Sequence, residues 1–272
     1  MKNTRVFIEV FFLAYLLILF ILWLIPPAYY DKFYKLKNAF SPEQNFFKAG
    51  WRKILTEKVS FYKNLTPKQK ILFEQKILEF INTYKIHGVG IDITDMDKLL
   101  VASSGVIPVF AIPTWYYKDL KNIYLYDDSF QIKHPMLPNG TLLNGLVGYG
   151  GMKNKMYLSR KALYESFKKD YDGQHTGMHE FLHLIDMEDG KADGIPDILI
   201  PKSYIKPWEN LIIKEIERIH NENSVLNNYA GANVAEFFAE SGVSFFENPE
   251  ELKKNHPELY HMLRLIFINK KK

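Results

Sequence analysis

Two histidines stand four residues apart in the segment 177–186, which reads Gly-Met-His-Glu-Phe-Leu-His-Leu-Ile-Asp. On a helix of 3.6 residues per turn, His179 and His183 lie one turn apart on the same face, so both imidazoles can bind one Zn²⁺ ion. Glu180 lies about 100° around the helix from His179, where it can take a proton from a catalytic water without being a ligand. This spacing predicts a hydrolytic zinc site. The alternative is an amphipathic helix whose two histidines merely face solvent.

A catalytic zinc site needs a third protein ligand, because three ligands leave the fourth position open for water. Downstream, the segment 229–246 has apolar residues at helical spacing, and Asn233 is a suitable N-cap for that helix. Glu236 and Glu240 then lie one turn apart on one face. One of them can bind the metal while the other holds a ligand histidine in place.

The motifs in three segments together resemble those of the MtfA-like zinc peptidases, and the likeness is strongest at residues 171–261. The motifs are His179-Glu180-Phe181-x-His183-x-x-Asp186, Gly190-x-x-Asp193-Gly194-x-Pro196 and Tyr229-x-x-x-Asn233-x-x-Glu236-Phe237-Phe238-Ala239-Glu240. The chain is also similar to the catalytic domain of anthrax lethal factor. The resemblance implies that Glu236 is the third zinc ligand, that Glu180 is the general base, and that Tyr229 polarises the scissile carbonyl or stabilises the oxyanion.

The resemblance also implies a fold, which is a mainly helical, zincin-like α+β domain with a small mixed sheet. The chain departs from the family pattern at two positions, where it has His175 four residues before the first ligand and Arg160 at the start of the preceding helix. Neither position is one of the proposed ligands. His175 could compete for the metal or shape the entrance to the site.

The composition is that of a globular protein, with 272 residues, 47% hydrophobic and 24% charged. The net charge of +4 is modest and the basic residues are scattered, so we expect no nucleic-acid surface. The chain has no cysteine, which excludes disulfides, a cysteine-ligated zinc and a cysteine protease.

The first 30 residues differ in composition from the rest of the chain. The segment 6–25 is apolar except for Glu9, and as a helix it matches the roughly 30 Å hydrocarbon thickness of a bilayer. It is longer than a cleavable signal sequence and does not end in a small-x-small site. We therefore expect a retained membrane anchor in residues 1–30 and a metallopeptidase domain in residues 31–272. The flanking lysines and the family's usual location favour a cytoplasmic domain.

Start signals and alternation predict several further elements. Ser41-Pro42 and Thr66-Pro67 predict helices over 41–60 and 66–84, and Thr94 can cap a third. Residues 122–126 and 155–158 are expected to be strands, the second leading into a helix capped by Ser159. We expect the strand 155–158 either to be the sheet edge that pairs with an extended substrate or to belong to an ordinary hairpin.

The predicted function is that of a membrane-anchored zinc metallopeptidase with one Zn²⁺ per chain, held by His179, His183 and Glu236. The zinc lowers the pKa of its water to about 7, and Glu180 takes the proton as hydroxide attacks a peptide carbonyl. Expected partners are a peptide or protein substrate, the bilayer and a regulatory protein. The alternative is a binding protein that recruits a partner such as a transcriptional regulator without hydrolysis. Asp186 is expected to support a ligand histidine, or otherwise to cap local backbone.

Overall fold

The computed structural model describes residues 47–132, 138–148, 153–168 and 174–268. The chain divides into two units, Met1–Phe46 and Phe47–Lys272, and the described residues all belong to the second. The predicted membrane anchor in residues 1–30 and the helix start signal at Ser41-Pro42 therefore lie outside the described residues. Within the described ranges, no helix combines the length and apolar character needed to cross a bilayer.

Helices at the start of the described chain begin where local capping residues predict them. α5 (Pro67–Thr83) and α6 (Asp95–Val106) follow Thr66 and Thr94. Each threonine side chain accepts a hydrogen bond from the backbone N–H three residues on, and the side chain there accepts one from the threonine N–H. In the described part of the predicted helix 41–60, the chain forms α3 (Ala49–Lys58), and the short α4 (Ser60–Lys63) follows it.

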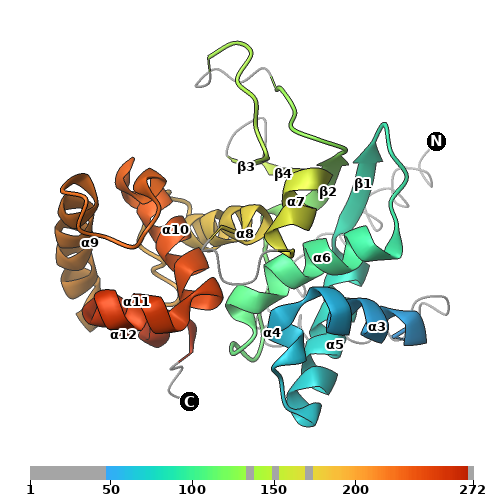
Figure 1. The fold of residues 1–272 in the computed structure, drawn as a ribbon, viewed down its shortest axis with the longest axis horizontal. Coiled ribbons are helices and arrows are strands. Elements are labelled where there is room, and N and C mark those ends of the chain that lie inside the picture. The colour runs from blue at the N-terminus through green and yellow to red at the C-terminus, as the bar shows by residue number, and fades with distance from the viewer. Residues whose placement is uncertain (1–46, 133–137, 149–152, 169–173, 269–272) are drawn as a thin grey trace, which may run out of the picture. The chain divides into compact units, whose positions relative to one another are not determined.

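One four-stranded mixed sheet lies beside these helices, with the strand order β1-β2-β4-β3 (Figure 1). β1 (Lys85–Val89), β2 (Leu120–Tyr126) and β4 (Asn154–Ser159) are parallel, and β3 (Gly145–Val147) pairs antiparallel with β4. β2 and β4 confirm the two predicted strands, whereas β1 and β3 were not predicted. The proposal that 155–158 is the sheet edge is wrong, because β4 lies between β2 and β3. The edge next to β4 is β3.

The metal-binding motif lies on α8 (Thr176–Asp186), which occupies the middle of the described unit (Figure 1). α7 (Arg160–Ser166), capped by Ser159 as predicted, leads from β4 towards it. One side of α8 packs on α6, α7, β3 and β4, and its other side packs on α10. Phe181 and Leu182 are fully buried and fix the orientation of the helix. This helical architecture with one small mixed sheet confirms the expected α+β class.

α8 and α10 approach closely at a glycine. A Cβ atom added at Gly242 would lie 2.8 Å from Leu182 Cδ1, so a larger residue would push the two helices apart. The remaining helices of the described C-terminal part are α9 (Ile205–His220), η5 (Asn228–Gly231), α10 (Val234–Glu247), α11 (Pro249–Asn255) and α12 (Pro257–Phe267). Short 3-10 turns occur at η1 (Ile107–Val109), η3 (Met187–Asp189) and η4 (Lys202–Tyr204).

Candidate metal centre

α8 and α10 bring three metal-ligating side chains together. His179 Nε2 and His183 Nε2 lie 3.0 Å apart, and Glu236 Oε2 lies 3.1 Å from the first and 3.2 Å from the second. In a tetrahedral zinc site with ligand distances of about 2.0–2.1 Å, ligand atoms are about 3.3 Å from one another. Within the described residues this is the group close enough to share one ion. The three atoms fit one face of a zinc tetrahedron, and the fourth corner is left for water or substrate.

The Glu236 carboxylate is oriented as a ligand would be. Its Oε2 is buried and accepts no hydrogen bond, although two imidazole nitrogens lie within 3.2 Å of it. A buried carboxylate oxygen without a hydrogen bond is costly. A cation placed between the three atoms removes that cost, so the residues present fit the zinc ion that the sequence predicts. Asn233 caps α10 as expected, because its Oδ1 accepts the Glu236 N–H at 3.0 Å.

Glu240, one turn after Glu236, holds the first histidine. Its Oε1 lies 2.9 Å from His179 Nδ1, which places the proton on Nδ1 and leaves Nε2 free to bind the metal. Burial lowers the pKa of His179, but the carboxylates of Glu236 and Glu240 outweigh burial and raise it to about 10. This geometry is compatible with Glu236 as the metal ligand and Glu240 as the residue that orients His179, which stays a prediction.

Asp186 follows the alternative expectation, since it caps local backbone. Its Oδ2 accepts the Gly194 N–H at 3.0 Å, and the residue is fully buried. Burial raises the pKa of Asp186 to about 7, while the Gly194 N–H opposes that shift. The loop after α8 is thereby fixed to the end of the helix, and Trp208 Nε1 donates to Gly194 O at 2.7 Å.

Glu180, which is not one of the three candidate ligands, lies against Gly145 of the edge strand β3. It is buried, and a Cβ atom added at Gly145 of β3 would lie 2.4 Å from its Oε1. Burial raises the pKa of Glu180, whereas His179 and His183 lower it. A buried carboxylate whose affinity for a proton is enhanced suits a general base that must also hold and return that proton. The role of Gly145 was not predicted from the sequence.

Tyr229 lies beside the metal ligands, at the start of η5. Its ring centroid is 6.2 Å from that of His179, and 53% of the residue is exposed. Burial of the hydroxyl and the nearby Glu236 carboxylate raise the pKa of Tyr229 to about 12. The phenol therefore keeps its proton at neutral pH and can donate a hydrogen bond to a substrate oxygen.

The two departures from the family pattern have structural roles. His175 is buried and caps α8, with its Nδ1 accepting the Met178 N–H at 3.1 Å, and burial lowers its pKa to about 4. It is not part of the group of possible metal ligands among the described residues. Arg160 donates to both oxygens of the buried Asp97, at 2.9 and 3.0 Å. This ion pair joins α7 to α6.

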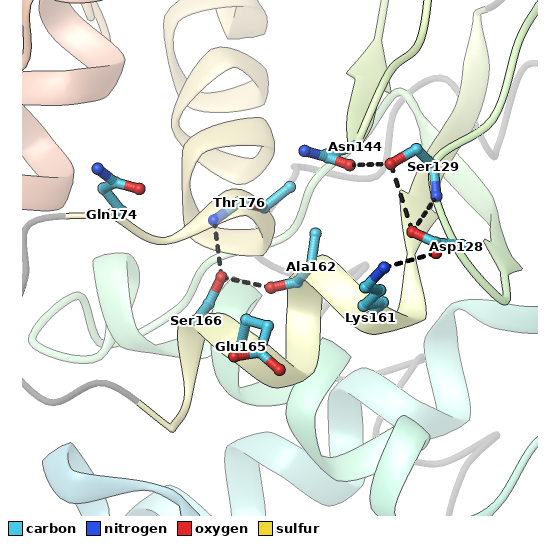
Figure 2. Close-up of a pocket in the computed structure, with 9 residues that line it drawn as sticks. All are labelled: Asp128, Ser129, Asn144, Lys161, Ala162, Glu165, Ser166, Gln174 and Thr176. Carbon is cyan, nitrogen blue, oxygen red and sulfur yellow. Dashed lines mark hydrogen bonds and ion pairs between the residues drawn. The ribbon is translucent and has the colours of Figure 1, made fainter.

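Two pockets lie near the ends of β3. A polar pocket of about 300 Å³ is lined by Asn144, just before the strand, and by Thr176 in the first turn of α8; Figure 2 shows these with Asp128, Ser129 and residues of α7. A second pocket, of about 230 Å³, lies at Val147 and Gly148 and includes Leu184 of α8. Leu184 follows Glu180 by one helical turn, so this pocket is on the same side of α8 as the buried carboxylate.

Known proteins resemble this chain over most of its length. Residues 34–268 match the family described as glucose-regulated metallo-peptidase M90. The chain is 28% identical over 225 residues to the uncharacterized protein slr2042 of Synechocystis sp., covering 79% of this chain and 82% of that protein. It is also similar to two proteins named Mlc titration factor A. The one from Edwardsiella ictaluri is 34% identical over 180 residues, which cover 62% of this chain and 67% of that protein. The one from Serratia proteamaculans is 27% identical over 183 residues, which cover 63% and 68%.

The family match spans all of the residues placed in the centre and the whole described part of the chain. The relatives named Mlc titration factor A agree with the likeness that the motifs on α8 and α10 indicate. The chain therefore belongs to the M90 metallo-peptidase family and is MtfA-like.

Proposed function

We propose that the protein is a zinc peptidase that hydrolyses peptide bonds, with Glu180 as general base. The observation that supports this most directly is the convergence of His179, His183 and Glu236 on one point, with ligand atoms 3.0–3.2 Å apart. When bound, zinc supplies a Lewis acid that acidifies water and polarises a carbonyl group. One zinc ion per chain satisfies these ligands.

Proton transfer is the part of the reaction assigned to Glu180. Its carboxylate takes a proton from the attacking water and delivers it to the leaving amine, which completes cleavage of the C–N bond. The raised pKa of Glu180 favours this exchange, because the carboxyl group must hold the proton between the two steps. Tyr229 donates a hydrogen bond to the carbonyl oxygen as negative charge develops on it, an interaction worth about 3 kcal/mol in comparable sites.

The substrate is proposed to be an extended peptide that pairs with β3. This strand is at the edge of the sheet, with β4 on one side and no strand on the other among the described residues. Leu146 directs its backbone groups at Tyr157 of β4, because Ser159 N–H donates to Asn144 O and hydrogen-bonded pairs alternate along antiparallel strands. The backbone groups of Gly145 and Val147 therefore face the free edge and can pair with a peptide, which would lie beside Glu180. The pockets at Asn144 and at Val147 lie at the two ends of the strand, where they can receive side chains from opposite ends of the peptide.

The test of the assigned base is the Glu180→Gln variant, prepared as the full chain and loaded with zinc. Its zinc content should equal that of the wild type, while cleavage of a peptide library should fall to background. The matched control is Glu217→Gln, the same substitution at an exposed position of α9, which should retain activity. Cleavage by Glu180→Gln at the wild-type rate would refute the assignment.

A second proposed function is the binding of a regulatory protein, and the names of the relatives favour it. Proteins called Mlc titration factor A are named for the titration of Mlc. We propose that this chain binds such a regulatory protein whether or not it hydrolyses peptide bonds. Equal partner binding by the wild type and by Glu180→Gln would separate this role from peptide cleavage.

Membrane attachment through residues 6–25 is part of the proposal, with the peptidase domain on the cytoplasmic side. It is supported by the apolar composition of that segment and by its flanking lysines. Membrane fractionation of the full chain and of residues 31–272, followed by protease digestion of sealed vesicles, tests both the attachment and the side.

A further inference from the structure

A fully buried histidine lies at the junction of α11 and α12, away from the metal ligands in the sequence. His256 Nδ1 is 2.5 Å from Glu215 Oε2 of α9. Arg218, one turn later on α9, donates to both oxygens of Glu215 at 3.1 and 3.3 Å and to Asn255 O at 3.1 Å. Its Nη1 also lies 3.0 Å from His256 Nδ1. The histidine is therefore joined to α9 by a buried charged group.

The other ring nitrogen of His256 contacts the loop that follows α9. Val225 N–H donates to His256 Nε2 at 3.3 Å, and Ser224 Oγ lies 3.2 Å from the same nitrogen. Because a backbone N–H can only donate, Nε2 carries the lone pair in this contact, which places the ring proton on Nδ1. That proton points to Glu215 Oε2, which at 2.5 Å is closer to Nδ1 than the Arg218 nitrogen at 3.0 Å. Ser224 Oγ in turn accepts the Leu226 N–H at 3.1 Å.

The same loop leads directly to Tyr229. Leu226 is buried, and Asn227 Oδ1 accepts the Tyr229 N–H at 3.0 Å. On the far side of Tyr229, His220 Nε2 lies 3.0 Å from Gly231 O. Tyr229 is 53% exposed and its side chain also interacts with Glu236, so its position depends on that contact and on the backbone on either side.

We infer that His256 is a positioning residue, which holds the loop 224–228 so that the Tyr229 hydroxyl stays beside the metal ligands. The chain of contacts runs from Glu215 through His256 to Val225 and then along the loop. This inference rests on the proposed function in so far as Tyr229 donates to the substrate. It gives α11 and α12, which contribute no metal ligand, a role in catalysis.

The experiment compares His256→Asn with His256→Gln in the zinc-loaded full chain. Asparagine can keep the donor that faces Glu215 but has no acceptor at the Nε2 position, whereas the glutamine amide oxygen reaches that position. We expect kcat to fall about tenfold in His256→Asn, which corresponds to the loss of one hydrogen bond, with KM and zinc content unchanged. His256→Gln should recover part of the loss. His261→Asn, the same substitution at an exposed position of α12, is the control.

A double-mutant cycle with Tyr229→Phe separates positioning from general damage. If His256 acts through the tyrosine hydroxyl, His256→Asn should cause no further loss of kcat in the Tyr229→Phe background. Equal losses in both backgrounds, or a wild-type kcat in His256→Asn, would overturn the inference. Ser224→Ala, which removes the acceptor of the Leu226 N–H from a partly exposed position, repeats the test if the His256 variants do not fold.

Amide hydrogen exchange tests the positioning without any hydrolysis. The amides of Val225 and Tyr229 should exchange faster in His256→Asn than in the wild type and in His261→Asn. If the zinc-loaded wild type cleaves no peptide, the proposed function fails. The amide exchange rates alone then show whether His256 holds the loop 224–228. Unchanged protection of both amides in His256→Asn would show that the loop does not depend on His256.

Discussion

Replacing Gly145 by alanine should disable the general base without altering a metal ligand. Gly145 is the first residue of the edge strand β3 and lies against the side chain of Glu180. An added Cβ atom would lie 2.4 Å from Oε1, 2.8 Å from Cγ and 2.9 Å from Cδ of Glu180. Ordinary contact begins at 3.4 Å, so the carboxylate oxygen must move from 2.4 Å to at least that distance, a displacement of about 1 Å.

A displacement of that size has a large effect on rate and a small one on folding. Misplacing a catalytic group by about 1 Å costs on the order of 10²-fold in kcat, which corresponds to about 2.7 kcal/mol. The atoms in conflict belong to the end of a flexible side chain, so the backbone of β3 need not move. Alanine also reduces the conformational freedom of the unfolded chain, so we expect the free energy of unfolding to change by less than about 1 kcal/mol.

The assay combines peptide cleavage with zinc analysis and urea unfolding. Gly145→Ala should keep one zinc per chain and a wild-type unfolding midpoint while losing about two orders of magnitude in kcat. Gly50→Ala is the matched control, because an added Cβ there meets nothing within 4 Å. Wild-type kcat in Gly145→Ala would refute the assignment of Glu180 as the base at this position, as would a loss of zinc equal to the loss of activity.

Three further changes test the metal site and its support. Glu240→Ala removes the partner of His179 Nδ1 and should weaken zinc binding by about 10–100-fold, measured by competition with a chelator. Because the pKa of His179 is raised to about 10 without metal, zinc binding at neutral pH should release a proton. The apparent zinc affinity should therefore rise as pH increases towards 10. Calorimetry in buffers of different ionisation enthalpy measures both the proton release and the affinity. Arg160→Ala leaves the buried Asp97 without its cation and should lower the free energy of unfolding by about 3 kcal/mol in urea titrations, with zinc binding retained.

The elements that the sequence predicts correctly are those fixed by local interactions. Thr66 and Thr94 form capping boxes within four residues of chain, and at the start of α10 the Asn233 side chain accepts the Glu236 N–H. A helix start of this kind needs no partner from elsewhere in the fold. The alternating residues of β2 and β4 are likewise visible, because one face of each strand is buried against helices.

The missed strands depend on neighbours that are distant in sequence. β1 contains Gly88 and no run of apolar residues, and it is a strand because it pairs in register with β2. β3 has three residues, and Asn144-Gly145 at its start is a pattern typical of a turn. Glycine stands at position 145 because Glu180 fills the space beside it, a contact across 35 residues that no local pattern reports.

Some residues of the candidate metal site could be predicted from local sequence patterns and others could not. Helical spacing alone brings His179 and His183 together, because four residues make about one turn. The position of Glu236 beside the two histidines depends on the packing of α10 against α8, for which Gly242 is required. The sequence indicates this position of Glu236 only through the family motif. The support of Tyr229 by His256 was not predicted, since the two residues share no motif and meet through a loop.

The position of each group around α8 explains why metal binding and proton transfer can be altered separately. His179 and His183 face α10, where Glu236 completes the candidate ligand group and Glu240 lies 2.9 Å from His179 Nδ1. Glu180 is turned about 100° from His179 and faces β3, where its carboxylate is enclosed by Gly145 and the strand. A change on the α10 side therefore acts first on zinc affinity, while a change on the strand side acts on the base and on the edge that receives substrate. Activity lost with zinc retained points to the strand side of the helix, and loss of both points to α10.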